Sequence, residues 1–163
     1  MQIRIATDVI TSIGRYKMTT KSECAEACNE LLKGELSAAE TYKQALEKFS
    51  DQAEAAQLRA LLTDHQDSIG ILAENVRKMG GQPAKDSGAW GGFAQAVQGV
   101  SNLFGESAAL SSLKKGEEKG KKDYQDALED DALMPECKEI VRNTLLPRQE
   151  AHIQILGRLD QQQ

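Results

Sequence analysis

The sequence predicts an all-α protein built as a bundle of four long helices. Strong helix formers, above all Ala, Leu, Glu, Lys and Gln, dominate the chain, and only 3 of its 163 residues are proline. Hydrophobic residues make up 40% of the chain, enough for the core of one ordinary domain, whereas 4% aromatic residues are too few for a β-sandwich. Apolar residues recur at helical spacing in four long segments.

Start and stop signals delimit the first two helices. Thr20–Glu23 (TKSE) has the form of a capping box, and helical spacing continues from there to about Phe49. Asp51–Glu54 (DQAE) offers a second capping box after a short turn. We expect that second helix to end at Met79, because Gly80–Pro83 (GGQP) supplies a C-terminal glycine followed by a proline.

A long connection, which contains a short helix of its own, leads to the last two helices. Apolar residues recur in it at steps of three and four, at Trp90, Phe93, Val97, Val100 and Phe104. The third long helix is predicted over roughly Ser107 to Glu129 and the fourth from Glu136 to about Asp160, with Pro135 at a first helical position. Four long helices with a long crossover between the second and the third describe an antiparallel bundle of ferritin-like topology.

Residues 1–18 differ from the rest, and we expect them to form a flexible arm or an interaction strand in front of a bundle over residues 19–163. They mix β-branched and polar residues and lack the apolar core and cleavage site of a secretory signal. The formal net charge of −5 argues against a nucleic-acid-binding face and against a polybasic membrane patch. No apolar run approaches the roughly 20 residues of a membrane span. Three cysteines, an odd number, fit a reducing cytoplasm better than a disulfide framework.

An internal repeat divides the predicted bundle into two related hairpins. The first and third helices share Lys-Gly-Glu, then Tyr, then Ala-Leu-Glu at the same offsets, at residues 33–35, 42 and 45–47 and again at 115–117, 124 and 127–129. Two unrelated helices would share alanine and leucine by chance, but seldom Gly-Glu and Tyr as well.

The strongest functional signal is a polar interruption near the middle of each apolar stripe. The ionisable or ligating interruptions are Glu35, His65, Glu117 and His152. Glu35 and His65 are equidistant from the first turn, and Glu117 and His152 from the last, so all four side chains should meet in one layer. A buried carboxylate needs a compensating partner, and carboxylate and imidazole ligands together suit iron, manganese or zinc.

Three segments resemble an uncharacterised bacterial branch of the ferritin-like superfamily. They are Gly34–Glu47, with its Gly-Glu, Tyr and Ala-Leu-Glu, Ser87–Trp90 (SGAW) and Leu146–His152 (LPRQEAH). The resemblance covers about residues 22 to 160. Relatives such as rubrerythrin and bacterioferritin bind a di-iron centre through one Glu from each of two helices and a Glu-x-x-His from each of the other two.

The resemblance implies transition-metal binding at Glu35, His65, Glu117 and His152, in iron handling or an oxidative-stress response, and a homo-oligomer. Leu62 and Gln149 stand where the two Glu-x-x-His motifs require glutamate, and Glu40 and Glu118 lie near the site but off the stripe. Two of the four usual carboxylates are therefore missing. Because this deficit would leave a trivalent pair poorly neutralised, the sequence leaves open whether the protein is an enzyme.

The same residues allow an alternative in which the layer is a metal-free network of His–Glu ion pairs. The chain would then be a structural or interaction protein, with residues 1–18 or the crossover around Trp90 and Phe93 as its contact surface.

Three further features carry expectations of their own. Tyr42 and Tyr124 are predicted to be core tyrosines bonded to a neighbour. Pro147 is expected to distort the fourth helix one turn before His152. Structural cysteines are predicted near the starts of the first and fourth helices, with a thiol cluster as the alternative, at Cys24, Cys28 and Cys137.

Overall fold

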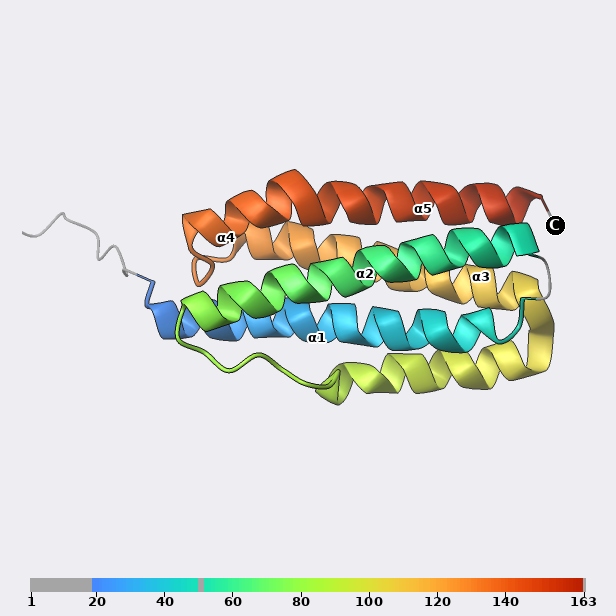
Figure 1. Ribbon diagram of the computed structural model, residues 1–163, viewed down its shortest axis with the longest axis horizontal. Helices are drawn as coiled ribbons and strands as arrows, with labels where there is room; N and C mark the ends of the chain where they lie inside the picture. Colours follow the sequence, from blue (N-terminus) through green and yellow to red (C-terminus); the bar gives the residue numbers. More distant parts are fainter. Residues whose placement is uncertain (1–18, 50–51, 163) are drawn as a thin grey trace, which may run out of the picture.

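A computed structural model describes the backbone of residues 19–49 and 52–162, and their side chains except those of residues 52 and 90–104. These residues form helices and loops with no strand among them, which confirms the predicted all-α class for this part of the chain (Figure 1). The α-helices are α1 (Lys21–Leu46), α2 (Gln52–Lys78), α3 (Gly91–Glu129), α4 (Pro135–Ile140) and α5 (Leu146–Gln161). The predicted arm over residues 1–18 lies outside the described residues. None of the described helices is long and apolar enough to cross a membrane.

The ends of the first two helices follow the predicted capping signals closely. Glu23 N–H donates to Thr20 Oγ1 at 3.2 Å and Thr20 N–H donates to Glu23 Oε2 at 3.0 Å, which completes the capping box of α1. α1 ends at Leu46, three residues before the predicted end, and α2 ends one residue before Met79. Beyond α2, Gly80 adopts φ +79°, and Gly81 N–H donates to the Val76 carbonyl at 2.9 Å, as in a Schellman motif. The predicted capping box at Asp51 falls partly outside the described residues.

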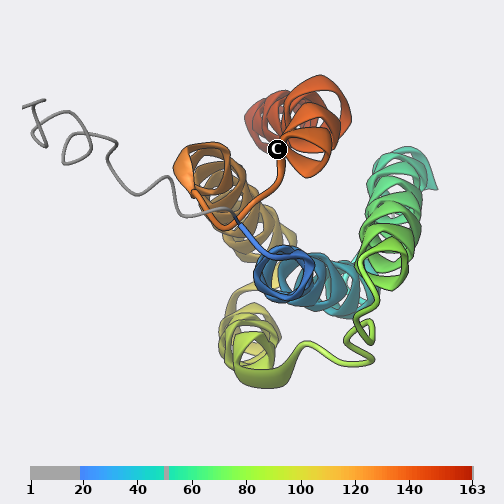
Figure 2. The same ribbon diagram turned by 90° about the vertical axis from the view of Figure 1, so that its left-hand side faces the viewer.

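Gly105 divides α3 into two helical parts that lie in different parts of the molecule. Gly105 has φ +79° and ψ −157°, which breaks the helical conformation between residues 91–104 and 106–129. The second part matches the third helix predicted from Ser107. The first part lies along the outer side of α1, away from the other bundle helices (Figures 1 and 2).

The predicted distortion of the last helix takes the form of a π-helical segment, Val141–Leu145, between α4 and α5. Leu146 N–H donates to the Val141 carbonyl, five residues back rather than four. Pro147 follows directly, and it lacks the N–H that would bond the carbonyl four residues before it, with which its ring would clash. The wider turn therefore accommodates the proline inside a continuous helix.

A sequence signal for this π segment is visible once the structure is known. The buried residues of this helix begin with three consecutive steps of four, at Cys137, Val141, Leu145 and Gln149. In a regular α-helix such a stripe would rotate by about 40° per step, or about 120° over the three steps. One extra residue in the π turn cancels most of that drift and returns Gln149 and His152 to the core.

Two apolar clusters fill the bundle, one on each side of a polar layer. α1 packs against α2 and α3, and α3 packs against α5. The first cluster includes Cys24, Leu32, Leu72, Val76, Leu133 and Leu145. The second includes Ala45, Leu58, Leu61, Leu110, Leu113, Leu156 and Leu159. The predicted polar residues lie between the two clusters.

Candidate metal centre

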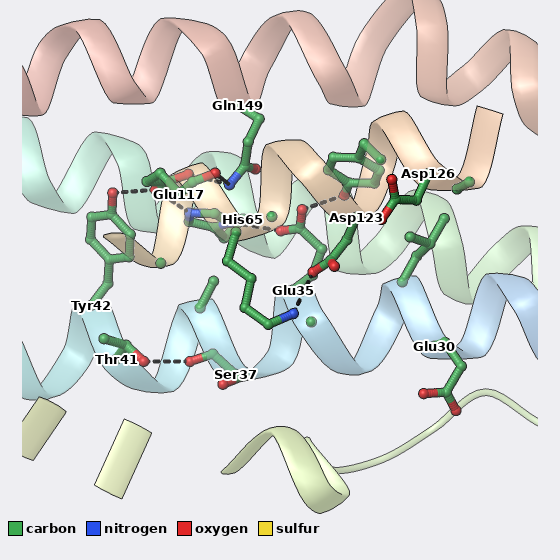
Figure 3. A pocket seen from close by; sticks show the side chains of 18 of the residues that line it. Glu30, Glu35, Ser37, Thr41, Tyr42, His65, Glu117, Asp123, Asp126 and Gln149 are labelled. Atoms are coloured by element: carbon green, nitrogen blue, oxygen red, sulfur yellow. Dashed lines mark hydrogen bonds and ion pairs between the residues drawn. The ribbon is translucent and has the colours of Figure 1, made fainter. Parts of the chain in front are cut away.

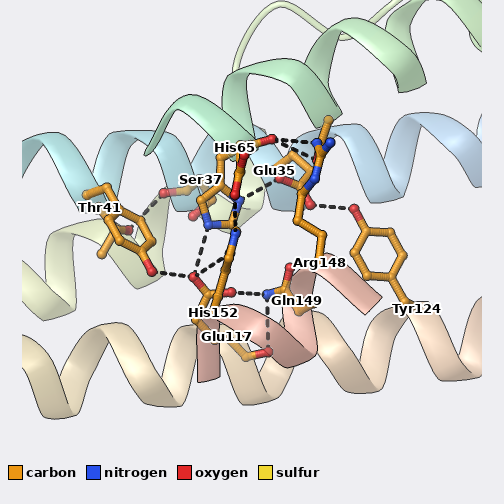
Figure 4. Close-up of polar contacts among 12 residues, drawn as sticks. Glu35, Ser37, Thr41, His65, Glu117, Tyr124, Arg148, Gln149 and His152 are labelled. Atoms are coloured by element: carbon orange, nitrogen blue, oxygen red, sulfur yellow. Dashed lines mark hydrogen bonds and ion pairs between the residues drawn. The ribbon is translucent and has the colours of Figure 1, made fainter. Parts of the chain in front are cut away.

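The four predicted residues are all buried and belong to one connected network in mid-bundle (Figure 4). Glu35 of α1 is 5% exposed, His65 of α2 1%, Glu117 of α3 2% and His152 of α5 1%. Each comes from a different helix, as predicted from the apolar stripes.

Glu117 is the centre of this network. Its Oε1 lies 3.0 Å from His65 Nε2 and 3.4 Å from His152 Nδ1. One potential ligand atom from each of these three residues lies within 4.8 Å of the other two. Glu35 is not part of that group, because its Oε2 lies 2.6 Å from the opposite nitrogen of His65, Nδ1. Three of the four predicted ligands therefore converge, while the fourth holds a histidine in place.

In each imidazole, the ring nitrogen that faces away from Glu117 contacts a second carboxylate. Glu35 faces His65 Nδ1, and Asp64 Oδ2 lies 3.1 Å from His152 Nε2. Asp64 lies off the core stripe of α2, so helical periodicity does not point to it, and its side chain is 43% exposed. Arg148 donates to the Asp64 carbonyl at 2.9 Å and to Ser68 Oγ at 3.0 Å, and so links α2 to α5 beside this contact.

The two tyrosines donate hydrogen bonds across the hairpins. Tyr42 of α1 donates to Glu117 of α3, and Tyr124 of α3 donates to Glu35 of α1. This confirms that both are core tyrosines bonded to a neighbour. The crossed pairing is the pattern expected if the repeated segments are related by an approximate two-fold axis.

The residues at the two positions that lack the expected glutamate behave differently. Gln149 Nε2 donates to Glu117 Oε2 and, at 3.2 Å, to the Glu117 carbonyl, whereas Leu62 packs at the edge of the second apolar cluster. A Cβ at Gly120 would lie 2.5 Å from Gln149 Nε2, so this glycine makes room for the amide. The off-stripe carboxylates lie elsewhere, since Glu40 accepts from Ser87 Oγ and Glu118 is exposed.

The electrostatics of the layer favour a protonated imidazole between ionised carboxylates. Burial alone would lower the pKa of His65, but the charge of Glu35 and the contacts with Glu117 outweigh it and raise the pKa to about 10. Burial alone would raise the pKa of Glu117, but its contacts with His152 and His65 lower it to about 2. Burial and the neighbouring carboxylates raise the pKa of Tyr42 and Tyr124 well above the usual range, so both act as neutral donors.

A cavity of about 300 Å³ between α1 and α3 reaches the layer (Figure 3). Glu35, His65 and Glu117 contribute to its wall, together with the small residues Gly34 and Gly116. A small molecule in this cavity would contact the polar layer without any opening of the helices.

The three cysteines form a second group of potential ligands. Their Sγ atoms all lie within 4.8 Å of one another, and all three thiols are buried and free, at Cys24, Cys28 and Cys137. Burial raises the pKa of Cys24 to about 11, whereas hydrogen bonds from Cys28 and Cys24 lower the pKa of Cys137 to about 6. The structure thus gathers into one cluster the cysteines that the sequence placed near the starts of the first and fourth helices, as in the thiol-cluster alternative.

A model of the family described as a domain of unknown function, DUF2383, matches residues 23–130, about two-thirds of the chain. The chain belongs to this family. The DUF2383 match takes in nearly all of α1 and the whole of α2, of the long connection and of α3, with Glu35, His65 and Glu117, and it ends before α4 and His152. No curated protein and no solved structure matches the chain.

Proposed function

We propose that this DUF2383 protein binds one first-row transition metal ion, iron foremost, at His65, Glu117 and His152 on a ferritin-like scaffold. The observation that carries the proposal is the orientation of the two imidazoles. One nitrogen of each ring faces Glu117 Oε1, while the other nitrogen faces the carboxylate of Glu35 or Asp64. Carboxylates behind histidines are the usual support of metal-ligating imidazoles, because they orient the ring and raise its basicity.

The donor set fits such an ion. Two histidines and one carboxylate bind non-haem Fe(II) in many proteins and also occur in zinc enzymes. Within the described part of the chain, His152 Nδ1 is buried with no hydrogen-bond partner, only the 3.4 Å ion-pair contact with Glu117 Oε1, which is costly for an imidazole nitrogen unless it binds something. Glu117 as a ligand and Glu35 behind His65 together supply two negative charges, which match a divalent ion.

One ion fits better than two. The carboxylates that would bridge a second ion are replaced by Leu62 and Gln149, and Glu35 is engaged with His65 and Tyr124. Glu35 is therefore a positioning residue in this proposal rather than a ligand. Manganese and zinc are alternatives to iron with the same donors.

The physiological setting follows from the ferritin-like resemblance and is iron handling or a response to oxidative stress, in a cytoplasmic homo-oligomer. Bound iron would supply one-electron chemistry toward oxygen or peroxide. The cavity between α1 and α3 supports this setting, since it gives a small oxidant a route to the Glu117 side of the layer.

Elemental analysis of protein purified without a histidine tag, before and after anaerobic incubation with Fe(II), tests the proposal. We expect about one equivalent of metal in the wild type, and loss of it in Glu117→Gln and His152→Ala. Glu40→Gln is the matched control, because this partly buried carboxylate accepts its hydrogen bond from Ser87, outside the layer. Equal metal contents in Glu117→Gln and Glu40→Gln would contradict the site.

The metal-free alternative makes the opposite prediction for the wild type. If the layer is only an ion-pair network, Fe(II), Mn(II) and Zn(II) leave both the metal content and the thermal midpoint unchanged. The protein would then be a structural or interaction protein on the same scaffold.

A further inference from the structure

Four sulfur atoms meet at the end of the bundle where α1 and α4 begin and α2 ends. Cys24 and Cys28 lie one helical turn apart on α1, and Cys24 Sγ is 3.4 Å from Cys137 Sγ of α4. The fourth sulfur, Met79 Sδ, lies 3.9 Å from Cys137 Sγ. All 3 cysteines of the chain are in this group, and none is more than 6% exposed.

These separations are close to those of a mononuclear thiolate site. Thiolates bound to one ion at about 2.3 Å lie about 3.8–4.0 Å from one another. The three Sγ atoms already lie within 4.8 Å of one another, so small rotamer changes would bring them to that spacing. Cysteines that merely fill core space as small apolar residues have no reason to converge on one point from two helices.

We infer that Cys24, Cys28 and Cys137 form a binding site for the soft cation Cu(I), with the Met79 thioether beside them. Thiolate and thioether sulfur select Cu(I), whereas structural zinc sites take four cysteine or histidine ligands. The Met134 N–H donates to Cys24 Sγ at 3.2 Å, a backbone donor that stabilises a thiolate at that position. Each thiol that binds releases its proton to solvent, and no electron is transferred.

An entry route lies next to the cluster. A cleft of about 270 Å³ runs between the start of α1 and the end of α2, and Met79 and Ala25 form part of its wall. A soft cation that reaches Met79 is already beside the sulfur of Cys137. The site is independent of the mid-bundle layer, because it uses other residues and a different class of donor.

Copper transfer under anaerobic, reducing conditions tests the inference. The probe is Cu(I) supplied as its bathocuproine disulfonate complex, whose visible absorption falls when copper leaves it. We expect the wild type to take up about one equivalent of Cu(I), with a new ultraviolet thiolate-to-Cu(I) band, and Met79→Leu to bind about 10-fold more weakly. The Cys24→Ser/Cys28→Ser/Cys137→Ser variant should lose both the uptake and the band.

Two controls keep the test decisive. His152→Ala should leave the uptake and the band unchanged, which separates this site from the mid-bundle layer. In the unsubstituted protein, Cu(I) should protect all three cysteines from iodoacetamide, as read by peptide mass spectrometry, so the test survives a serine variant that fails to fold. Equal alkylation with and without Cu(I), or retention of Zn(II) but not Cu(I) by the thiols, would overturn the assignment.

Discussion

The two hairpins of the bundle carry the same repeated segment, yet they contribute unequally to the polar layer. Glu35 of the α1–α2 hairpin contacts His65 and Tyr124, whereas Glu117 of the α3–α5 hairpin contacts both histidines, Tyr42 and Gln149. The two glutamates occupy equivalent positions in the repeat, so the difference lies in their surroundings. A repeated motif therefore predicts where a side chain lies but not how many partners it has.

The surroundings differ at two places. Three residues before its histidine, the first hairpin has Leu62 and the second has Gln149, which adds a donor to Glu117 alone. The first hairpin consists of regular helices, whereas the second contains the π segment Val141–Leu145, which sets the rotation of the helix that carries Gln149 and His152. Both differences give Glu117 more partners than Glu35 and place it at the centre of the polar layer.

Replacing each glutamate by alanine in turn should show most strongly that Glu117 has more partners than Glu35. We expect Glu117→Ala to lower the unfolding free energy of the metal-free protein by about 3–5 kcal/mol, because it leaves a buried imidazolium with one partner fewer and several buried donors without one. Glu35→Ala should cost only about 1–3 kcal/mol, since His65 keeps Glu117. Urea unfolding of both variants measures the difference, and equal midpoints would contradict the unequal contributions of Glu117 and Glu35 to stability.

The pH dependence of the metal-free protein should separate His65 from Glu117. The pKa of His65 is about 10 in the fold against 6.5 normally, so its contribution to stability is complete below pH 6.5 and is lost as the pH rises toward 10. The pKa of Glu117 is about 2 against 4.5, so its contribution is complete above pH 4.5 and is lost as the pH falls toward 2. Each contribution amounts to a few kcal/mol.

Urea midpoints across this range, in the presence of EDTA, check both directions. His65→Gln should remove most of the fall in urea midpoint above pH 6.5 and should leave most of the fall below pH 4.5. Bound metal requires neutral imidazoles, so a metal-loaded protein should lose less stability than the metal-free protein between pH 6.5 and 10. A wild type whose midpoint rises between pH 6.5 and 10 without metal would contradict the ion-pair assignment.

Making the second hairpin resemble the first should have the smallest of these effects. Gln149→Leu removes a donor from the buried Glu117 and should cost about 1–3 kcal/mol. The reciprocal Leu62→Gln should cost about 1 kcal/mol, because Leu62 is only partly buried. If thermal melts show the two costs to be equal, Gln149 is not the source of the difference between the hairpins.

Much of the fold was predictable because short local sequence signals mark where helices begin and end. The capping box at Thr20, the glycines after α2 and Pro135 at the start of α4 mark helix ends through short-range hydrogen bonds and fixed φ angles. The π segment was predictable only as a distortion near Pro147. Its form depends on keeping Gln149 and His152 against the other helices, which is a tertiary requirement.

Within the site, the sequence by itself determined which residues share the buried layer. Helical periodicity and equal distances from the turns were enough for Glu35, His65, Glu117 and His152, because helix geometry converts residue number into height and direction. Only the tertiary structure decided which atoms meet. Asp64, which lies off the stripe, contacts His152, and Glu35 contacts the nitrogen of His65 that faces away from Glu117. The thiols of three cysteines from two helices lie close together. Such contacts depend on helix rotation and side-chain rotamers, which shift atoms by ångströms while leaving the sequence pattern unchanged.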